Sequence, residues 1–279
     1  MLLSDVGARA VMTLDLDDLT GGWECPPGEL RARLLTGRDG RELVQLRVDL
    51  GLMQMFTDGR PDGERYHGLP SARAYVEHEL RLGGRHLSPE HWQELERELV
   101  QTNYRRMALA AVSDDALRSN DESGARRCIQ HALRDVDECL ANLQLLEAQG
   151  GAKGGFATLA PSLVFDRGRL GVQLHVMEGR IEVAIEQAQA GAAELDKLLA
   201  ELGYDEQQRG EDAGLRYLRQ IAQQLRQEYG VAQTLREQLA KAIEDEDFER
   251  AAALRDELTQ REQDATANPP RRTRSGAQD

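Results

Sequence analysis

Residues 235–258 read LREQLAKAIEDEDFERAAALRDEL, two amphipathic segments separated by the acidic run 244–247. In the first segment, apolar residues recur at i, i+4, i+7 and i+8, the spacing typical of one helix face; they are Leu235, Leu239, Ala242 and Ile243. The second segment carries a similar stripe, with Leu254 at its margin, formed by Phe248, Ala251, Ala252, Arg255 and Leu258. The pattern predicts a hairpin of two helices.

The turn between the two segments carries signals for the start of a second helix. Asp247 is a candidate N-cap, because its carboxylate can accept the free backbone N–H groups of the next turn. We expect the paired alanines to let the helices approach closely, and Phe248 to supply the one large apolar contact. Helices this short are marginal in water. The apolar stripe is therefore covered by the rest of the chain, by a second copy or by a partner, and the pattern leaves these alternatives open.

The same stretch resembles the UVR motif, the helical hairpin shared by two of the bacterial excinuclease proteins, near the C-terminus of one and within the other. The resemblance is carried by Leu235, Leu239, Ala242, the Asp247-Phe248-Glu249 turn, Ala251-Ala252, Leu254, Arg255-Asp256 and Leu258. It implies a docking element that pairs with another UVR hairpin in antiparallel fashion. The contact is then expected at Leu235, Leu239, Ile243, Phe248, Ala252, Arg255 and Leu258.

The charge of the chain argues against direct binding of nucleic acid. The net charge is −14, and residues 231–262 alone carry five Arg or Lys against nine Asp or Glu. Affinity for nucleic acid comes mostly from clustered basic side chains that neutralise phosphates. Three arginines in the tail, within 271–274, form a local basic group, and we expect them to be solvated.

Signals for catalysis, metal binding and membrane insertion are missing from the sequence. It contains no phosphate-binding G-x-x-x-x-G-K-[ST] loop, no HExxH and no G-x-S-x-G motif. Cys25, Cys128 and Cys139 form no CxxC pair, so no zinc site is indicated. No apolar run is long enough to span a membrane, and the first residues do not resemble a signal peptide. We therefore expect a cytoplasmic protein without enzymatic activity, metal or cofactor.

The N-terminal region has strand periodicity instead. Residues 30–34 alternate, Gly37 to Gly40 form a turn, and apolar residues alternate strictly from Val44 to Leu52, which predicts a β-hairpin. The opposite face of the second strand, with Gln45, Arg47 and Asp49, should face water or a partner. Together with the following loop, this region resembles the N-terminal part of uncharacterised bacterial UVR motif-containing proteins, over about residues 28–68.

The loop from Asp58 to Gly63 allows two interpretations. As a ligand-contact loop, it would expose the Arg60 guanidinium to a carboxylate or phosphate, and Asp58 and Asp62 could hold a cation. As a plain connector, its aspartates would hydrogen-bond their own backbone.

Helical patterning dominates from Ser71 onward, with Ser71 as a candidate cap. Helices are expected at about 88–112, 124–148, 168–178 and 180–202, with polar breaks at Asp114-Asp115 and at 119–121. The segment from Gly179, GRIEVAIEQAQAGAAEL, resembles the second half of a tetratricopeptide repeat. Residues 211–229 carry a 3-4-3-4 seam typical of a short coiled coil, which serves self-association or packs on the chain's own helices; it consists of Leu215, Leu218, Ala222, Leu225 and Tyr229.

The sequence as a whole predicts a mostly α protein of the α+β class. A β-containing module (1–85) precedes tetratricopeptide-like helical hairpins (86–205), a coiled-coil-like helix with the UVR hairpin (211–262), and a disordered tail (263–279). The favoured function is a non-enzymatic adaptor whose partner is another UVR-bearing protein or a second copy. The alternative is an accessory protein of nucleotide excision repair that contacts excinuclease proteins and DNA. An enzyme that uses the Asp58–Gly63 loop is a third class.

Overall fold

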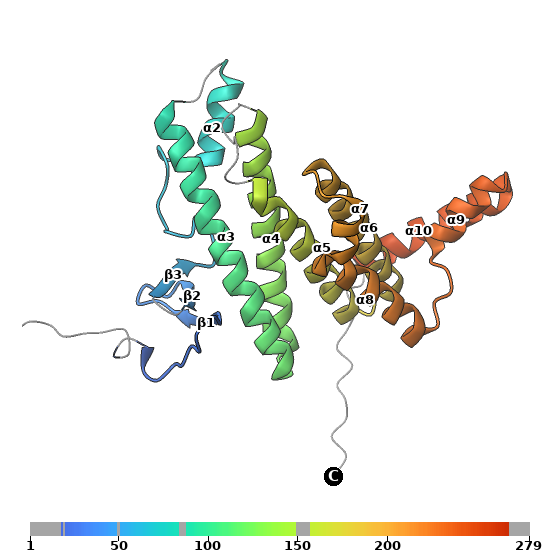
Figure 1. The fold of residues 1–279 in the computed structure, drawn as a ribbon, viewed down its shortest axis with the longest axis horizontal. Coiled ribbons are helices and arrows are strands. Elements are labelled where there is room, and N and C mark those ends of the chain that lie inside the picture. Colours follow the sequence, from blue (N-terminus) through green and yellow to red (C-terminus); the bar gives the residue numbers. More distant parts are fainter. Residues whose placement is uncertain (1–17, 19, 49–50, 84–87, 149–156, 268–279) are drawn as a thin grey trace, which may run out of the picture.

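A small antiparallel sheet at the N-terminus is followed by helices, as predicted for a mostly α protein of the α+β class (Figure 1). The computed structural model describes residues 18, 20–48, 51–83, 88–148 and 157–267. The strands are β1 (Arg31–Thr36), β2 (Glu42–Val48) and β3 (Gly51–Phe56). The helices are α2 (Ala72–Arg81), α3 (Pro89–Arg118), α4 (Glu122–Ala148), the short 3-10 helix η1 (Ala157–Leu159), α5 (Ala160–Met177), α6 (Ile181–Glu201), α7 (Glu206–Glu211), α8 (Ala213–Tyr229), α9 (Leu235–Glu244) and α10 (Phe248–Ala267).

The helices form successive antiparallel pairs. α3 and α4 make one long hairpin, α5 and α6 make a second, and α8 packs beside α6 (Figure 1). The third pair, α9 and α10, projects to one side of this helical body (Figure 1). α3 alone has 30 residues, nearly the length of a whole two-helix tetratricopeptide repeat of about 34. The tetratricopeptide likeness therefore does not describe α3 and α4, and for α6 it stays a prediction.

The sheet has three strands where the alternation predicted two. β2 pairs with β1 and also with β3, in the order β1-β2-β3. The single strand expected from Val44 to Leu52 is wrong, because Val48 pairs with Gly51 and the chain reverses between them. The core-facing residues of β3 are Met53 and Met55, opposite Leu46 and Val44, so Leu52 shares the other face with Gln54. Leu52 is apolar all the same, so the alternation read from the sequence looks uninterrupted. Periodicity alone therefore could not detect this turn.

The buried face of the sheet packs on the long helices. Val44, Leu46 and Met55 of the sheet join Leu109 of α3 and Ile129 of α4 in one apolar cluster. The opposite face carries a polar ladder instead. Gln45 accepts a hydrogen bond from Arg33 at 2.9 Å and donates one to Gln54 at 2.9 Å.

This ladder is covered by the segment that precedes β1. The Arg33 guanidinium lies 4.3 Å from the centre of the Trp23 ring, and Arg47 donates to the Trp23 carbonyl. The prediction that this face meets water or a partner is thus wrong for Gln45, which is only 9% exposed.

Helix starts follow the predicted caps, while two helices are longer than expected. The Ser71 side chain accepts from the Ala74 amide at 3.0 Å and begins α2. α3 continues through the break expected at Asp114-Asp115, and Asp114 pairs with Arg169 of α5 at 3.2 Å. α5 begins at Ala160 instead of 168, with a proline in its first turn.

The coiled-coil-like seam of α8 is used inside the molecule. Leu215 and Leu218 pack with residues of α5 and α6 in one cluster, and Ala222 and Leu225 pack in a second. Tyr229, the last residue of the seam, is 49% exposed. The sequence left self-association and internal packing open for this seam. Its four buried residues pack on the chain's own helices.

The region boundaries shift at the C-terminal end. α10 continues to Ala267, so residues 263–267 are helical and not part of a disordered tail. The remaining predicted tail, 268–279, lies outside the described residues.

Candidate functional site

The two helices of the C-terminal hairpin begin and end at well-defined caps. Thr234 and Glu237 form a reciprocal capping box at the start of α9. At its end, the amide of Asp247 donates to the Ala242 carbonyl at 2.8 Å and that of Glu246 donates to the Ile243 carbonyl at 3.1 Å. This pair of bonds is a Schellman motif. The Asp247 carboxylate then accepts from the Arg250 amide at 3.1 Å, which confirms the predicted N-cap of α10.

Glu246 occupies the left-handed position of this turn, with φ 57°. Replacing Glu246 by glycine should stabilise the hairpin by about 0.5–1 kcal/mol, because glycine adopts positive φ without a Cβ clash. Slower amide hydrogen exchange in α9 and α10 would report this gain. The matched control is Glu244→Gly, two residues earlier in α9, which should destabilise by about 1 kcal/mol. If both substitutions change the stability of the hairpin equally, Glu246 does not occupy the left-handed position of the turn.

The inner face of the hairpin forms a small apolar core of its own. Its buried residues are Leu235, Ala242, Ala251 and Leu254, flanked by the partly buried Leu239 and Leu258. Leu254, expected at the margin of the stripe, is therefore part of the core, at 8% exposure. α10 is rotated by roughly a quarter turn from the predicted orientation, since each residue advances the helix by about 100°.

Two large apolar side chains on either side of the turn, called the apolar patch below, are exposed. Phe248 is 69% exposed and Ile243 is 55% exposed. Phe248 therefore does not supply the predicted contact between the two helices. Ala252 and Arg255 are also exposed. Of the seven predicted contact residues, the structure places Leu235, Leu239 and Leu258 inside the hairpin and the other four on its surface.

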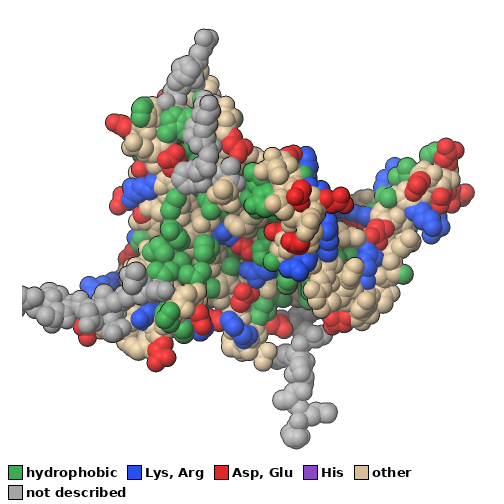
Figure 2. Space-filling view, in the orientation of Figure 1, with side chains coloured by type: hydrophobic (Ala, Val, Ile, Leu, Met, Phe, Trp, Pro, Cys, Tyr) green, Lys and Arg blue, Asp and Glu red, His purple; other side chains and the backbone are tan. Residues whose placement is uncertain are grey.

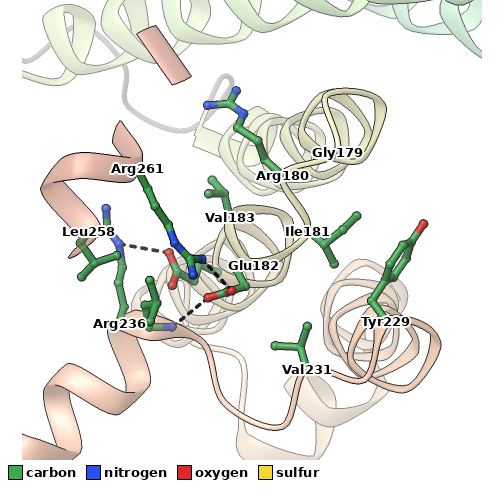
Figure 3. Close-up of a pocket in the computed structure, with 12 residues that line it drawn as sticks. Gly179, Arg180, Ile181, Glu182, Val183, Tyr229, Val231, Arg236, Leu258 and Arg261 are labelled. Atoms are coloured by element: carbon green, nitrogen blue, oxygen red, sulfur yellow. Dashed lines mark hydrogen bonds and ion pairs between the residues drawn. The ribbon is translucent and has the colours of Figure 1, made fainter. Parts of the chain in front are cut away.

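Polar contacts join the base of the hairpin to α6 (Figure 3). Glu182 of α6 accepts from the Leu235 amide at 3.0 Å and from Arg261 at 2.9 Å. Arg236 pairs with Glu186 at 3.1 Å. These α6 glutamates were missed by the sequence analysis, because no local signal links residues that lie about 50–80 positions apart along the chain.

Glu237 adds a contact between the hairpin and the body. Burial alone would raise its pKa, but hydrogen bonds from Gln189, from the Thr234 amide and from Arg226 outweigh burial and hold the pKa below its usual value. Because docking lowers this pKa, the ionised Glu237 carboxylate stabilises the docked hairpin at pH values above the usual carboxyl pKa. This stabilisation is lost as the pH falls through the lowered pKa. Docking of the hairpin therefore weakens in acid.

A cavity of about 620 Å³ lies between the hairpin base and the body. In Figure 3, Tyr229 and Val231 lie on one side and Leu258 and Arg261 on the other, with Ile181 and Val183 of α6 between them. Its volume falls in the range of small-molecule sites, about 300–1,000 Å³. The base of the hairpin thus rests on the body through ion pairs at the edge of a mostly apolar cavity.

Removing both α6 glutamates should loosen this junction. For Glu182→Gln combined with Glu186→Gln, we expect a loss of about 1 kcal/mol, discounted because both partner arginines are more than half exposed. Spin labels on cysteines introduced at Ala253 and Glu201, with Cys25 replaced by serine, should show a broader distance distribution in pulsed EPR. High salt should broaden the wild-type distribution in the same way.

The control for this experiment removes two glutamates at the far end of the hairpin. Glu244→Gln combined with Glu249→Gln leaves the contacts with α6 intact, so the distance distribution should stay that of the wild type. A broadening as large as that of the Glu182 and Glu186 variant would show that these α6 contacts do not hold the hairpin.

The Asp58–Gly63 loop does not present its arginine to solvent. The Arg60 side chain is 2% exposed and pairs with Asp62 at 2.8 Å and with Glu94. Asp62 also accepts from the Glu64 amide at 3.0 Å, as the connector interpretation predicts. Asp58 pairs with Arg134 at 3.1 Å. The exposed fork predicted for Arg60 is therefore wrong, since its guanidinium is already bound by carboxylates of the chain.

Fold and site together define a mostly helical protein that presents a projecting, self-contained helical hairpin. Residues 231–263 match the family model of the UvrB/uvrC motif, which covers α9 and α10 as far as residue 263. The hairpin is thus a UVR motif, as the sequence predicted. No curated protein and no solved structure matches the chain.

Membrane-spanning helices and clusters of metal-binding side chains were looked for in the described ranges. Within them, none of the helices combines the length and the apolar character needed to cross a membrane. The same residues contain no group of three or more His, Cys, Asp or Glu side chains arranged to hold a metal ion.

Proposed function

We propose that this protein is a non-enzymatic adaptor that binds another protein through the outer face of its UVR hairpin. The observation that carries the proposal is the exposure of Phe248 and Ile243 on a hairpin whose inner face is already packed. Large apolar side chains this exposed, on either side of one turn, are typical of contact surfaces between proteins. The partner is a UVR-bearing protein or a second copy of this chain.

The charges around the patch suit a partner with basic residues. The acidic run 244–247 lies in the turn, next to both Ile243 and Phe248. Arg255 and Asp256, 3.7 Å apart and both at least 70% exposed, offer charges of opposite sign about two helical turns after Phe248. Complementary charges at the rim of a contact set its orientation more than its strength.

Capture from the native host tests this function. The tagged full chain is cross-linked in cells and its partners are identified by mass spectrometry, in parallel with the Phe248→Asp variant. We expect a UVR-bearing protein, or this chain itself, to be cross-linked to residues 239–258 in the wild type only. The same partners with both chains would overturn the proposal.

Analytical ultracentrifugation of the purified protein separates the two partner classes. A dimer that dissociates on dilution, and that Phe248→Asp abolishes, identifies the second copy as the partner. If the protein is a monomer at every concentration, the partner that binds the outer face is a different protein.

The family name of the motif favours a second candidate, an accessory role in nucleotide excision repair through contact with excinuclease proteins. The DNA contact included in that alternative is not supported by charge. On the face that Figure 2 shows, Lys and Arg side chains alternate with Asp and Glu over the body and the hairpin. The full chain should therefore not shift a DNA duplex in a native gel, even at low salt where phosphate contacts are strongest. A shift that salt abolishes would favour this second candidate.

A further inference from the structure

The cavity at the base of the UVR hairpin has mostly apolar walls and is accessible from solvent (Figure 3). Val183 of α6 and Tyr229 at the end of α8 are 39% and 49% exposed, so two of its walls reach the surface. Ile181, Val231 and Leu258 supply further apolar walls. With a volume of about 620 Å³, the cavity can hold a side chain as large as that of phenylalanine, because sites of about 300–1,000 Å³ hold whole small molecules.

The exposed Phe248 of the same chain cannot fill this cavity. Leu258, which lines the cavity, lies ten residues after Phe248 in α10. A helix advances about 1.5 Å per residue, so the two residues are about 15 Å apart along the helix. Leu235 also lines the cavity, and it lies at the end of α9 that is far from the turn. The exposed aromatic ring and the cavity are therefore at opposite ends of the hairpin, and only another molecule can bring such a ring into the cavity.

The charges at the two ends of the hairpin are complementary. The acidic run 244–247 at the turn is exposed at all four positions. At the edge of the cavity, the side chains of Arg236 and Arg261 are more than half exposed, and the cavity lining as a whole carries three arginines and two glutamates. A guanidinium group has five N–H donors, and the bonds from Arg261 to Glu182 at 2.9 Å and to Glu257 at 2.8 Å use two of them. A hairpin turn that approaches this edge therefore brings carboxylates to a surface with a positive balance of charge.

We propose that this cavity binds the hairpin turn of a second copy of this chain, with Phe248 of that copy in the cavity and its acidic run at the arginine edge. The inference rests on the proposed function, because it names the partner and the surface that the outer face of the hairpin meets. Two hairpins that lie antiparallel about a two-fold axis place each turn at the base of the other. Both cavities are then filled at once, as in other interfaces with two-fold symmetry, where each contact occurs twice.

Cross-linking between two different full-length chains tests this arrangement. One chain carries Asp245→Cys in the turn, and the other, made longer by a tag, carries Val183→Cys in the cavity wall. Cys25 is replaced by serine in both, while Cys128 and Cys139 are buried. With a short bis-maleimide reagent, we expect the product that joins the two different chains to dominate. If the reagent joins only two Asp245→Cys chains, or joins none, the turn does not meet the cavity and the inference is wrong.

A substitution that fills the cavity tests the same contact without changing the turn. Val183→Trp places a large ring in the cavity and should raise the dissociation constant of the dimer at least about tenfold, because the aromatic contact is lost. Leu202→Trp is the matched control, since Leu202 ends the same helix, is 40% exposed and lies outside the cavity lining. Analytical ultracentrifugation measures both dissociation constants, and circular dichroism checks that both variants fold. Equal dissociation constants of the two folded variants would overturn the inference.

The same measurements distinguish failure of this inference from failure of the proposed function. A dimer that Phe248→Asp abolishes but Val183→Trp leaves intact would show that the outer face binds a second copy at another surface. The inference would then be wrong and the proposed function would stand. A wild-type chain that stays monomeric up to about 100 μM would leave the cavity to another occupant, such as a small apolar molecule, and would also refute the inference. In that case, capture from the native host decides whether the outer face binds a different protein.

Discussion

Replacing Arg105 by methionine should cost about 3–5 kcal/mol of folding free energy, the range expected when a buried ion pair loses one partner. The Arg105 side chain is 1% exposed, and its Nε and Nη2 atoms each donate to Asp135 at 2.7 Å. Its Nη1 atom donates to the carbonyls of Phe56 at 3.0 Å and Gly59 at 2.6 Å. One side chain thus joins α3 and α4 to the end of the sheet.

The effect is large because the Arg105→Met substitution leaves the buried Asp135 carboxylate without its main partner. Asp135, with a side chain that is 0% exposed, would keep only the partly exposed Arg134 as a charged partner. The carbonyls of Phe56 and Gly59 would also lose a donor, but Gly59 is exposed, so the buried carboxylate of Asp135 dominates the cost. A typical protein is stable by only about 5–15 kcal/mol, so the variant should melt roughly 10 °C lower. Thermal unfolding followed by circular dichroism measures the change.

Two further variants make the Arg105 result interpretable. Arg118→Met, at the exposed end of the same helix, removes only a surface pair with Asp115 and should change stability by less than about 1 kcal/mol. Arg105→Met combined with Asp135→Leu removes both charges, and should recover part of the loss because no unpaired charge stays buried. If the Arg105→Met and Arg118→Met variants unfold at the same temperature, the central role assigned to the Arg105–Asp135 ion pair is wrong.

Phe248→Asp should abolish binding of the partner without changing the stability of the fold. An aromatic residue in the centre of a contact contributes about 2–4 kcal/mol, which corresponds to a loss of roughly 30- to 1,000-fold in affinity. Aspartate also places a further negative charge beside the acidic run 244–247. In the free protein Phe248 is 69% exposed, so little packing is lost. Surface plasmon resonance with the captured partner measures the affinity.

A control with equal exposure separates a specific contact from general stickiness. Leu82, at the end of α2, is 72% exposed and lies outside the hairpin, so Leu82→Asp should leave the affinity unchanged. Both variants should unfold at the wild-type temperature. If Leu82→Asp weakens binding as much as Phe248→Asp, the outer face of the hairpin is not the contact surface.

The features of the C-terminal hairpin that depend only on residues a few positions apart could be predicted from the sequence. The Asp247 cap and the acidic turn depend on hydrogen bonds between residues a few positions apart, which the sequence displays directly. The orientation of α10 was not predictable. Phe248 and Leu254 both fit an apolar stripe, and only contact with α9 selects Leu254 for the core and leaves Phe248 outside.

The N-terminal region shows the same division. Alternation correctly marked strand residues from Val44 onward. The reversal between Val48 and Gly51 stayed hidden because Leu52 is apolar although it lies on the face opposite to Val44 and Leu46. One interpretation of the Asp58–Gly63 loop exposed Arg60, and nothing in the sequence singled out Arg105, because arginine is rarely buried. Their burial depends on carboxylates 30 or more positions away, Glu94 and Asp135 respectively.

The sequence by itself determined the secondary structure class, the UVR motif, the caps and the acidic character that disfavours DNA, because these depend on composition and on neighbours within one or two helical turns. Tertiary structure alone decided which helix faces are buried, that the α8 seam packs internally, and that Glu182 and Glu186 hold the hairpin base. The physical reason is that burial and ion pairing depend on side chains brought together from distant parts of the chain. Their free energies are set by the shared, poorly solvated environment and not by local spacing.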